Sequence, residues 1–171
     1  MKKLIILSLI LFVTFSCSKD SESENSKISA SIIGVWQGTG MTYDGTVESS
    51  ESGQTIKADF TGEGFNMNNT LTFNENPNTL VSKGSYGLKL TYTINGFTTT
   101  EEINETNFIE DGTWSLEGDQ LFVTNNGETT IMKILELSNH KLIISFSETE
   151  VIEEEGVIAT TNFKGTFVFK R

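Results

Sequence analysis

The sequence predicts an all-β protein, an antiparallel up-and-down meander that closes into a barrel of about eight strands. Apolar and polar residues alternate with period two, as in residues 88–94 and 142–146, which is typical of strands with one buried face. The tight-turn pairs Asn95-Gly96 and Asn126-Gly127 separate such segments and favour sequential antiparallel neighbours. We find no amphipathic stretch long enough to predict a helix. Closure follows because long open edges would invite aggregation.

Composition excludes several classes of protein. The 171 residues suit one ordinary domain, and 12 basic against 23 acidic residues give a net charge of −11. This charge argues against nucleic acid as a partner, because phosphate binding needs a basic surface. The single cysteine excludes a disulfide framework and a cysteine-built metal cluster.

The first element is predicted to be a signal peptide over residues 1–16. Lys2 and Lys3 precede the apolar stretch 4–15, which is shorter than the roughly 20 residues that span a bilayer. The run Thr14-Phe15-Ser16-Cys17 resembles the lipobox of bacterial lipoproteins, which implies that Cys17 is acylated with chains such as palmitate and anchors the protein in the lipid bilayer. The alternative is an ordinary secretory signal that leaves Cys17 as a free thiol.

Residues 17–31 are predicted to form the lipid anchor and a disordered tether rich in serine and acidic residues. Ser18 follows the cysteine where inner-membrane retention would favour aspartate, so we expect an outer-membrane lipoprotein. The acidic residues Asp20, Glu22 and Glu24 fit either a signal for export to the cell surface or a plain spacer.

The barrel domain is predicted over residues 32–171. Turn residues divide it, including the only proline at Pro77, Glu117-Gly118-Asp119 and Glu155-Gly156. Residues 44–64 fit either a long loop or a weakly patterned strand. The predicted strands are 32–43, 54–61 with 67–74 (as one bent strand or two), 79–94, 97–103, 111–116, 119–124, 128–137, 141–152 and 157–170.

Two Gly-x-Trp segments, Gly34-Val35-Trp36 and Gly112-Thr113-Trp114, resemble those of the lipocalin-like domains found in bacterial lipoproteins. The resemblance implies a lipocalin-like barrel. It also implies a barrel-closing motif in which Trp36, after Gly34, packs across the closed end beneath a basic side chain of the last strand, either Lys170 or Arg171. A cation–π contact of this kind is worth about 0.5–2 kcal/mol.

The residues give little support to catalysis. The only histidine, His140, falls in an apparent turn, and no nucleophile elbow is present. Acidic residues such as Glu101 and Glu153 fall at strand ends or turns, where carboxylates are usually solvated. We therefore predict no enzyme, no cofactor and no metal site.

Two functions remain open, and we expect a monomer in both. The first is a binding module for a small apolar ligand in a barrel cavity, for which Gly84, Ser85 and Gly87 leave room. The second is a solid barrel, filled by large residues of the late strands, that contacts a protein or glycan at the cell surface through loops such as 44–58. The candidate ligand-lining residues are Phe60, Phe65, Met67, Leu88, Leu90, Tyr92, Phe97 and Phe108.

Overall fold

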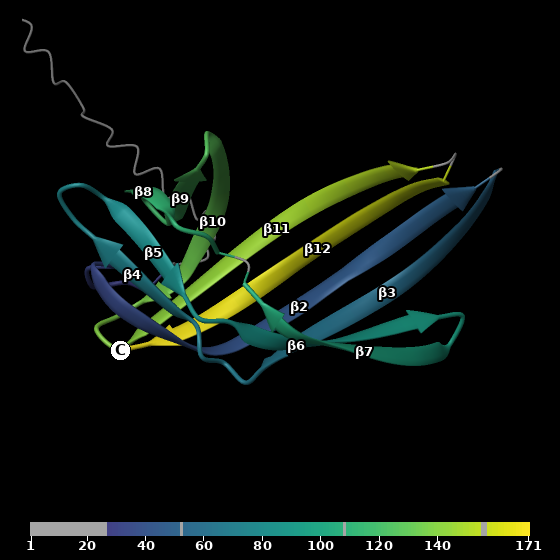
Figure 1. The fold of residues 1–171 in the computed structure, drawn as a ribbon, viewed down its shortest axis with the longest axis horizontal. Coiled ribbons are helices and arrows are strands. Elements are labelled where there is room, and N and C mark those ends of the chain that lie inside the picture. The colour runs from purple at the N-terminus through teal and green to yellow at the C-terminus, as the bar shows by residue number, and fades with distance from the viewer. Residues whose placement is uncertain (1–26, 52, 108, 155–156) are drawn as a thin grey trace, which may run out of the picture.

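The computed structural model describes residues 27–51, 53–107, 109–154 and 157–171. These residues form strands, turns and loops (Figure 1). No helix in these ranges is long and apolar enough to cross a membrane. The strands are β1 (Lys27–Ile28), β2 (Gly34–Glu51), β3 (Gln54–Phe65), β4 (Thr70–Asn74), β5 (Thr79–Lys83), β6 (Tyr86–Ile94), β7 (Phe97–Thr106), β8 (Gly112–Glu117), β9 (Gln120–Asn125), β10 (Glu128–Leu137), β11 (Lys141–Glu154) and β12 (Val157–Lys170).

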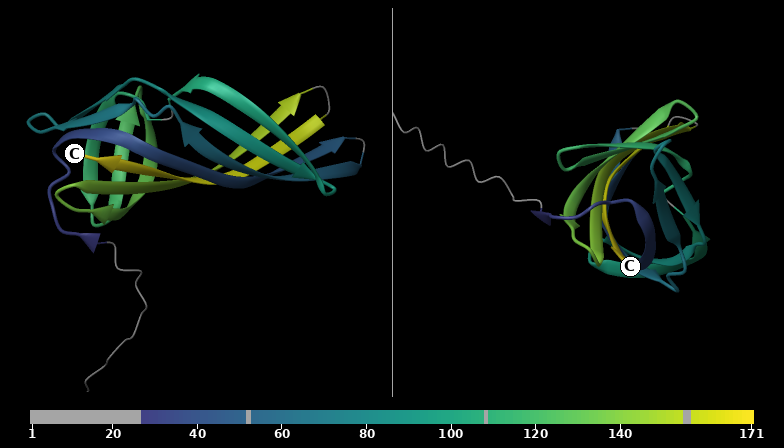
Figure 2. Two further views of the ribbon diagram at one scale, coloured as in Figure 1. Left: turned by 90° about the horizontal axis from the view of Figure 1, so that it is seen from below. Right: turned by 90° about the vertical axis from the view of Figure 1, so that its left-hand side faces the viewer.

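Eight strands form a closed barrel. Around the wall they follow chain order, β2, β4, β5, β8, β9, β10, β11 and β12, and the pairing of β12 with β2 closes the ring. The right-hand view of Figure 2 shows this ring. The predicted all-β fold and eight-stranded antiparallel barrel are therefore confirmed.

The remaining strands β3, β6 and β7 extend the sheet beyond the barrel. Residues 34–37 of β2 pair with β4 in the barrel wall, whereas residues 42–51 pair with β3. Pairing then continues from β3 to β6 and from β6 to β7. We use the term extended sheet for strands β3, β6 and β7 together with the parts of β11, β12 and β2 that lie beyond the ring. Figure 1 shows its long strands sweeping away from the barrel.

Residues 44–64 belong to the extended sheet as the outer half of β2 and nearly all of β3, so a strand and not a loop is correct here. Their alternation is weak in the sequence because small residues occupy the face that would otherwise be apolar. Gly45, Ala58, Gly62 and Gly64 all lie on that face by register.

Two predicted strands divide differently. The single strand predicted over 79–94 is wrong, because the chain breaks at Gly84, whose φ is +74°, and at Ser85, whose amide donates to the Asn68 side chain. After this break β5 stays in the barrel while β6 crosses to pair with β3. Segments 54–61 and 67–74 are likewise separate strands, since β3 and β4 pair with different halves of β2.

The last five residues of the predicted tether lie against the barrel. Strand β1 pairs in parallel with β10, and the amide of Ser29 donates to the carbonyl of Leu137 at 2.8 Å. The next apolar residue, Ile32, is buried. Residues 1–26, including Cys17, lie outside the described residues.

Candidate binding site

Large side chains fill the barrel. Every barrel strand except β8 sends fully or nearly fully buried residues into one cluster, and Trp114 and Leu116 of β8 pack against it. The late strands fill the interior as their sequence predicts. The buried apolar residues of the cluster are Ile32, Trp36, Met41, Leu71, Phe73, Leu80, Tyr86, Leu88, Ile109, Leu121, Val123, Met132, Ile134, Leu137, Leu142, Ile144, Phe146, Phe167 and Phe169.

Trp36 and Arg171 close one end of the barrel. The guanidinium carbon of Arg171 lies 4.2 Å from the ring centroid of the fully buried Trp36, whose indole N–H donates to the carbonyl of Ile32 at 2.7 Å. Gly34 adopts a φ of +122° beside this pair, and a Cβ there would stand 3.4 Å from Arg171 Nη1. The arrangement is structural, because the Trp36 ring offers no surface to a ligand.

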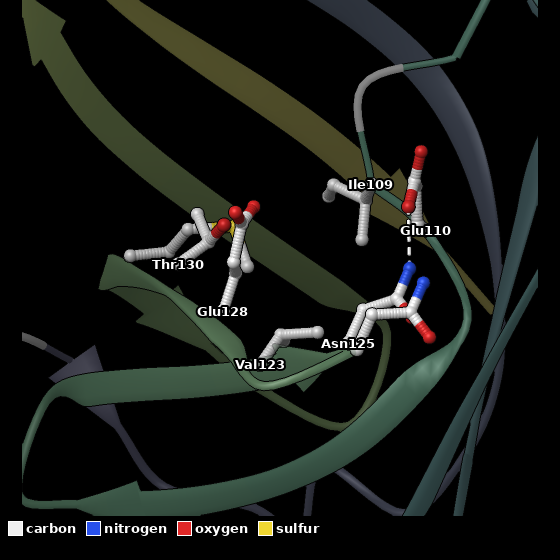
Figure 3. A pocket seen from close by; sticks show the side chains of 8 residues that line it. Ile109, Glu110, Val123, Asn125, Glu128 and Thr130 are labelled. Carbon is white, nitrogen blue, oxygen red and sulfur yellow. Dashed lines mark hydrogen bonds between the residues drawn. The ribbon is translucent and has the colours of Figure 1, made fainter.

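The opposite end, the mouth of the barrel, holds a small polar cavity. The connection before β8 inserts Ile109 into the core, and a space of about 260 Å³ remains beside it (Figure 3). The side chain of Asn125 donates to the carboxylate of Glu110 across this space, and Glu128 also borders it. With two carboxylates at its border, this cavity is a poor place for an apolar ligand.

Strands β10 and β11 separate near the mouth. Their pairing stops at Lys133 and Ser145, and Figure 1 shows β10 turning away while β11 continues into the extended sheet. A groove of about 490 Å³ occupies the gap, and the apolar side chains of Met132 and Phe146 help to line it. Because Phe146 also belongs to the core, the groove brings solvent close to the aromatic residues at the mouth.

Aromatic rings cluster where the barrel meets the extended sheet. Tyr43 contacts Phe146 and Phe163 edge-to-face, with ring centroids 5.5 and 5.9 Å apart. Phe146 and Phe163 also meet edge-to-face at 6.0 Å. Burial raises the pKa of both Tyr43 and Tyr86 at this junction. Such edge-to-face contacts hold the rings in defined orientations.

The same face of the extended sheet continues this apolar surface. In one register row Phe146, Gly165, Tyr43, Gly62 and Leu90 follow one another across five strands. The next row comprises Phe163, Gly45, Phe60 and Tyr92. Residues opposite each other in neighbouring strands share a face. A third row adds Val47 and Ile94. We use the term inner face for the large apolar residues of these three rows that are at least partly exposed: Tyr43, Val47, Phe60, Leu90, Tyr92, Ile94 and Phe163.

Glycines let the rings lie close to this sheet. A Cβ on Gly165 would stand 2.4 Å from the ring of Phe146, and one on Gly45 would stand 2.7 Å from the ring of Phe60. Both distances are too short for a real Cβ, so each ring occupies the space above its glycine neighbour.

The opposite face of the extended sheet is mostly polar and carries its ion pairs, although Phe65, Val151 and Ile158 also lie on it. Lys57 pairs with Glu48 at 3.0 Å, and Lys164 pairs with Asp44 at 3.4 Å, all four on this face. The ion pairs therefore lie on one face, while the aromatic residues and the row of glycines lie on the other. Large exposed hydrophobic surfaces of this kind often mark binding sites.

Carboxylates border the inner face along both edge strands. Glu148 and Glu150 lie on β11, and Glu101 lies on β7 opposite Leu90. Burial, and to a lesser extent the charge of Glu150, raises the pKa of Glu148. Burial and the charge of Glu101 raise the pKa of Tyr92.

The structure brings only part of the predicted lining together. Phe60 and Tyr92 lie 5.9 Å apart by ring centroids, next to Leu90, on the inner face. However, β3 and β6 lie outside the closed wall, so these residues surround no barrel cavity. The pairing of β3 with the outer half of β2 explains the difference, and the sequence pattern of 44–64 is too weak to reveal it.

The other predicted lining residues lie elsewhere. Leu88 and Met67 pack against the barrel core, and Phe65 lies over Gly87 on the opposite face of the sheet. Phe97 is 81% exposed at the tip of the β6–β7 hairpin, where it is paired with Ile94 at the far end of the inner face. Phe108 lies outside the described residues.

Sequence reasoning missed Tyr43 and Glu148 as parts of this site. Phe163 carried a signal, because it shares a sequence face with Phe167 and Phe169. Tyr43 and Glu148 join it only through the register of β2 with β12 and of β11 with β12, which no local pattern reveals.

The described residues show no constellation for metal binding or for nucleophilic catalysis. In these ranges no three His, Cys, Asp or Glu side chains are grouped as metal ligands. His140 is exposed in the turn between β10 and β11. The arrangement instead offers an apolar surface with acidic borders.

Comparison with known proteins identifies one relationship. Residues 32–144 match a family model described as a lipocalin-like domain, and this match covers most of the barrel. Neither a curated protein nor a solved structure matches the chain significantly.

Proposed function

Because the chain belongs to the lipocalin-like domain family, we propose that it is an outer-membrane lipoprotein whose barrel domain is a non-catalytic binding module for a small apolar ligand. On this proposal, acyl chains on Cys17 hold the domain at the bilayer. In the same proposal the ligand binds at the mouth of the barrel, which is a common place for ligand sites in β-barrels.

The observation that supports this proposal is the partly exposed inner face. Phe60, Leu90 and Tyr92 present apolar surface to solvent next to a barrel that is already filled. Burying this surface beneath an alkyl or ring system would release about 25 cal/mol for each Å² of apolar area. The ligand therefore lies on the extended sheet at the mouth of the barrel, and not inside the barrel.

A second candidate function is a solid interaction domain that contacts a protein or glycan partner at the cell surface. The filled barrel favours this candidate, as do exposed apolar residues far from the mouth. Phe97 is 81% exposed and Ile56 is 60% exposed, both toward the far end of the extended sheet. A large partner would cover these residues, whereas a small ligand at the mouth would not.

Native mass spectrometry distinguishes the two functions. All strands of the described residues lie within 27–171, so the mature chain without its acylated cysteine, residues 18–171, keeps their pairing. We expect it to retain a non-ionic alkyl probe, dodecyl maltoside below its micelle concentration, as a one-to-one adduct. Absence of any adduct in the unmodified chain would favour the interaction domain.

A matched pair of variants locates the adduct. Leu90→Asp places a charge on the inner face, and Thr91→Asp places the same charge on the opposite face of the same strand. We expect loss of the adduct in Leu90→Asp only, with both variants checked for native circular dichroism. Equal retention in both variants would contradict binding on the inner face.

A further inference from the structure

We propose that the ligand of the inner face is a cationic amphiphile, an apolar body with one positively charged group, and that Glu148 binds this group. The inference rests on the proposed function, because it names the chemical class of the ligand at the same site. It depends on where Glu148 lies, on the charges around it and on the rings beside it.

Glu148 lies at the border of the aromatic surface. It is the register partner of Phe163 across β11 and β12, so the two side chains emerge on the same face. Phe163 in turn contacts Tyr43 edge-to-face. Glu148 is partly buried on β11, which among the described residues has no paired strand beyond residue 145 on its other side. Its carboxylate therefore stands between the apolar surface and open solvent.

The carboxylate of Glu148 has no cationic partner among the described residues. The ion pairs of the extended sheet, Lys57–Glu48 and Lys164–Asp44, lie on its opposite face. Burial raises the pKa of Glu148, and the nearby charge of Glu150 raises it further. A partly buried, unpaired carboxylate is unfavourable, and a bound cation would relieve this cost through a charge-assisted contact.

The inner face as a whole favours a positive charge. Glu101 borders it on β7, and Glu148 and Glu150 border it on β11. In the register rows that form this face, the described residues include no lysine, arginine or histidine. The partly exposed rings of Tyr43 and Phe163 add surfaces that attract cations, each contact worth about 0.5–2 kcal/mol. An anionic amphiphile would meet repulsion at both edges.

The same charges argue against a second copy of the chain as the occupant. Face-to-face packing of two inner faces would bring the acidic borders of both copies together. Like charges brought together in this way destabilise an interface. A small cationic ligand meets no such repulsion.

Calorimetric titration of residues 18–171 at pH 8 and low salt tests the inference with three probes of equal chain length. These are dodecyltrimethylammonium, dodecyl maltoside and dodecanoate, each below its micelle concentration. We expect the cationic probe to bind about tenfold more tightly than the non-ionic probe, and dodecanoate to bind most weakly. Glu148→Gln should remove the advantage of the cationic probe and keep the affinity for dodecyl maltoside.

Glu153→Gln is the matched control, because it removes the same charge from the same strand on the opposite face. It should leave the preference for the cationic probe unchanged. Equal affinity for the cationic and non-ionic probes would overturn the inference and leave the proposed function standing. A preference that persists in Glu148→Gln would overturn the role of Glu148. Failure of all three probes to bind, or a dimer that excludes them, would overturn both the inference and the proposed function.

Discussion

Arg171, the last residue of the chain, lies over Trp36 of the first barrel strand, with its guanidinium carbon 4.2 Å from the ring centroid. The same guanidinium donates to the backbone carbonyls of Ile33 at 2.8 Å, Ser31 at 3.2 Å and Asn139 at 2.8 Å. One side chain thus joins the segment before β2, the turn between β10 and β11, and the end of β12. This contact closes that end of the barrel.

Replacing Arg171 should destabilise the barrel. Arg171→Ala removes the cation–π contact and three charge-assisted hydrogen bonds, so we expect a loss of about 2–4 kcal/mol in the free energy of unfolding. Arg171→Lys keeps the charge but loses the planar fork, so its stability should lie between that of Arg171→Ala and that of the unmodified chain. Urea denaturation measures both, with the exposed Lys170→Ala as the control. A midpoint for Arg171→Ala equal to that of the control would contradict the closing role.

Glycines beneath the aromatic rings should be intolerant of a methyl group. Gly165→Ala would place a Cβ 2.4 Å from the ring of Phe146 and 2.9 Å from Tyr43 Cδ1. We expect a loss of about 1–3 kcal/mol, because a packed cluster accommodates extra volume only by strain. In Gly40→Ala the nearest atom would be Val168 Cβ at 3.9 Å, so its unfolding midpoint should stay near that of the unmodified chain. Equal midpoints for the two variants would show that the rings do not occupy this space.

Stability should fall as the pH rises from about 10 to about 12. Burial raises the pKa of Tyr86 to about 12 and the pKa of Tyr43 still further, whereas unfolded tyrosines titrate near pH 10. The unfolded state therefore loses its tyrosine protons first. The stabilisation that the two protonated tyrosines contribute is complete below pH 10 and is lost as the pH rises from about 10 to about 12.

A double variant isolates the tyrosine contribution to this pH dependence from that of lysines. Tyr43→Phe with Tyr86→Phe should lose less stability across the window than the unmodified chain, by roughly 2 kcal/mol. Urea titrations at pH 9 and pH 11.5 measure the difference. Parallel losses in the two proteins would mean that neither hydroxyl is protected from water.

The lipid anchor is a separate prediction. Whole-protein mass spectrometry of the protein from cells should show acyl chains on an N-terminal Cys17, and Cys17→Ser should release the protein from the membrane fraction. An unmodified mass that begins elsewhere, with the cysteine as a free thiol, would support the ordinary secretory signal instead.

The barrel could be predicted because its determinants are local. Alternation in 142–146 and the turn at Asn126-Gly127 identify strands and hairpins directly, and the short meander from β8 to β12 then follows in order. The Trp36 motif came from a resemblance, and the structure places Arg171 over its ring as that resemblance implies.

The extended sheet could not be predicted, because its determinants are pairings between distant segments. Gly45 and Gly62 carry no side chain, so their strands lack a visible apolar face until side chains of neighbouring strands, Phe60 over Gly45 and Leu90 over Gly62, lie over them. Gly84, where the chain breaks, also looks like an ordinary strand residue in the sequence, because apolar residues occur on both sides of it. Phe60, Leu90 and Tyr92, predicted to line a cavity, therefore lie on an open face.

Methyl-resolved NMR during titration with dodecyl maltoside tests the central claim most directly. If the ligand binds the inner face, the methyl resonances of Val47, Leu90 and Ile94 should shift in proportion to occupancy. Those of the fully buried core residues Leu121 and Leu142 should stay in place. Shifts centred on Leu121 and Leu142 would place the ligand inside the barrel, and an absence of shifts at saturating probe would contradict ligand binding.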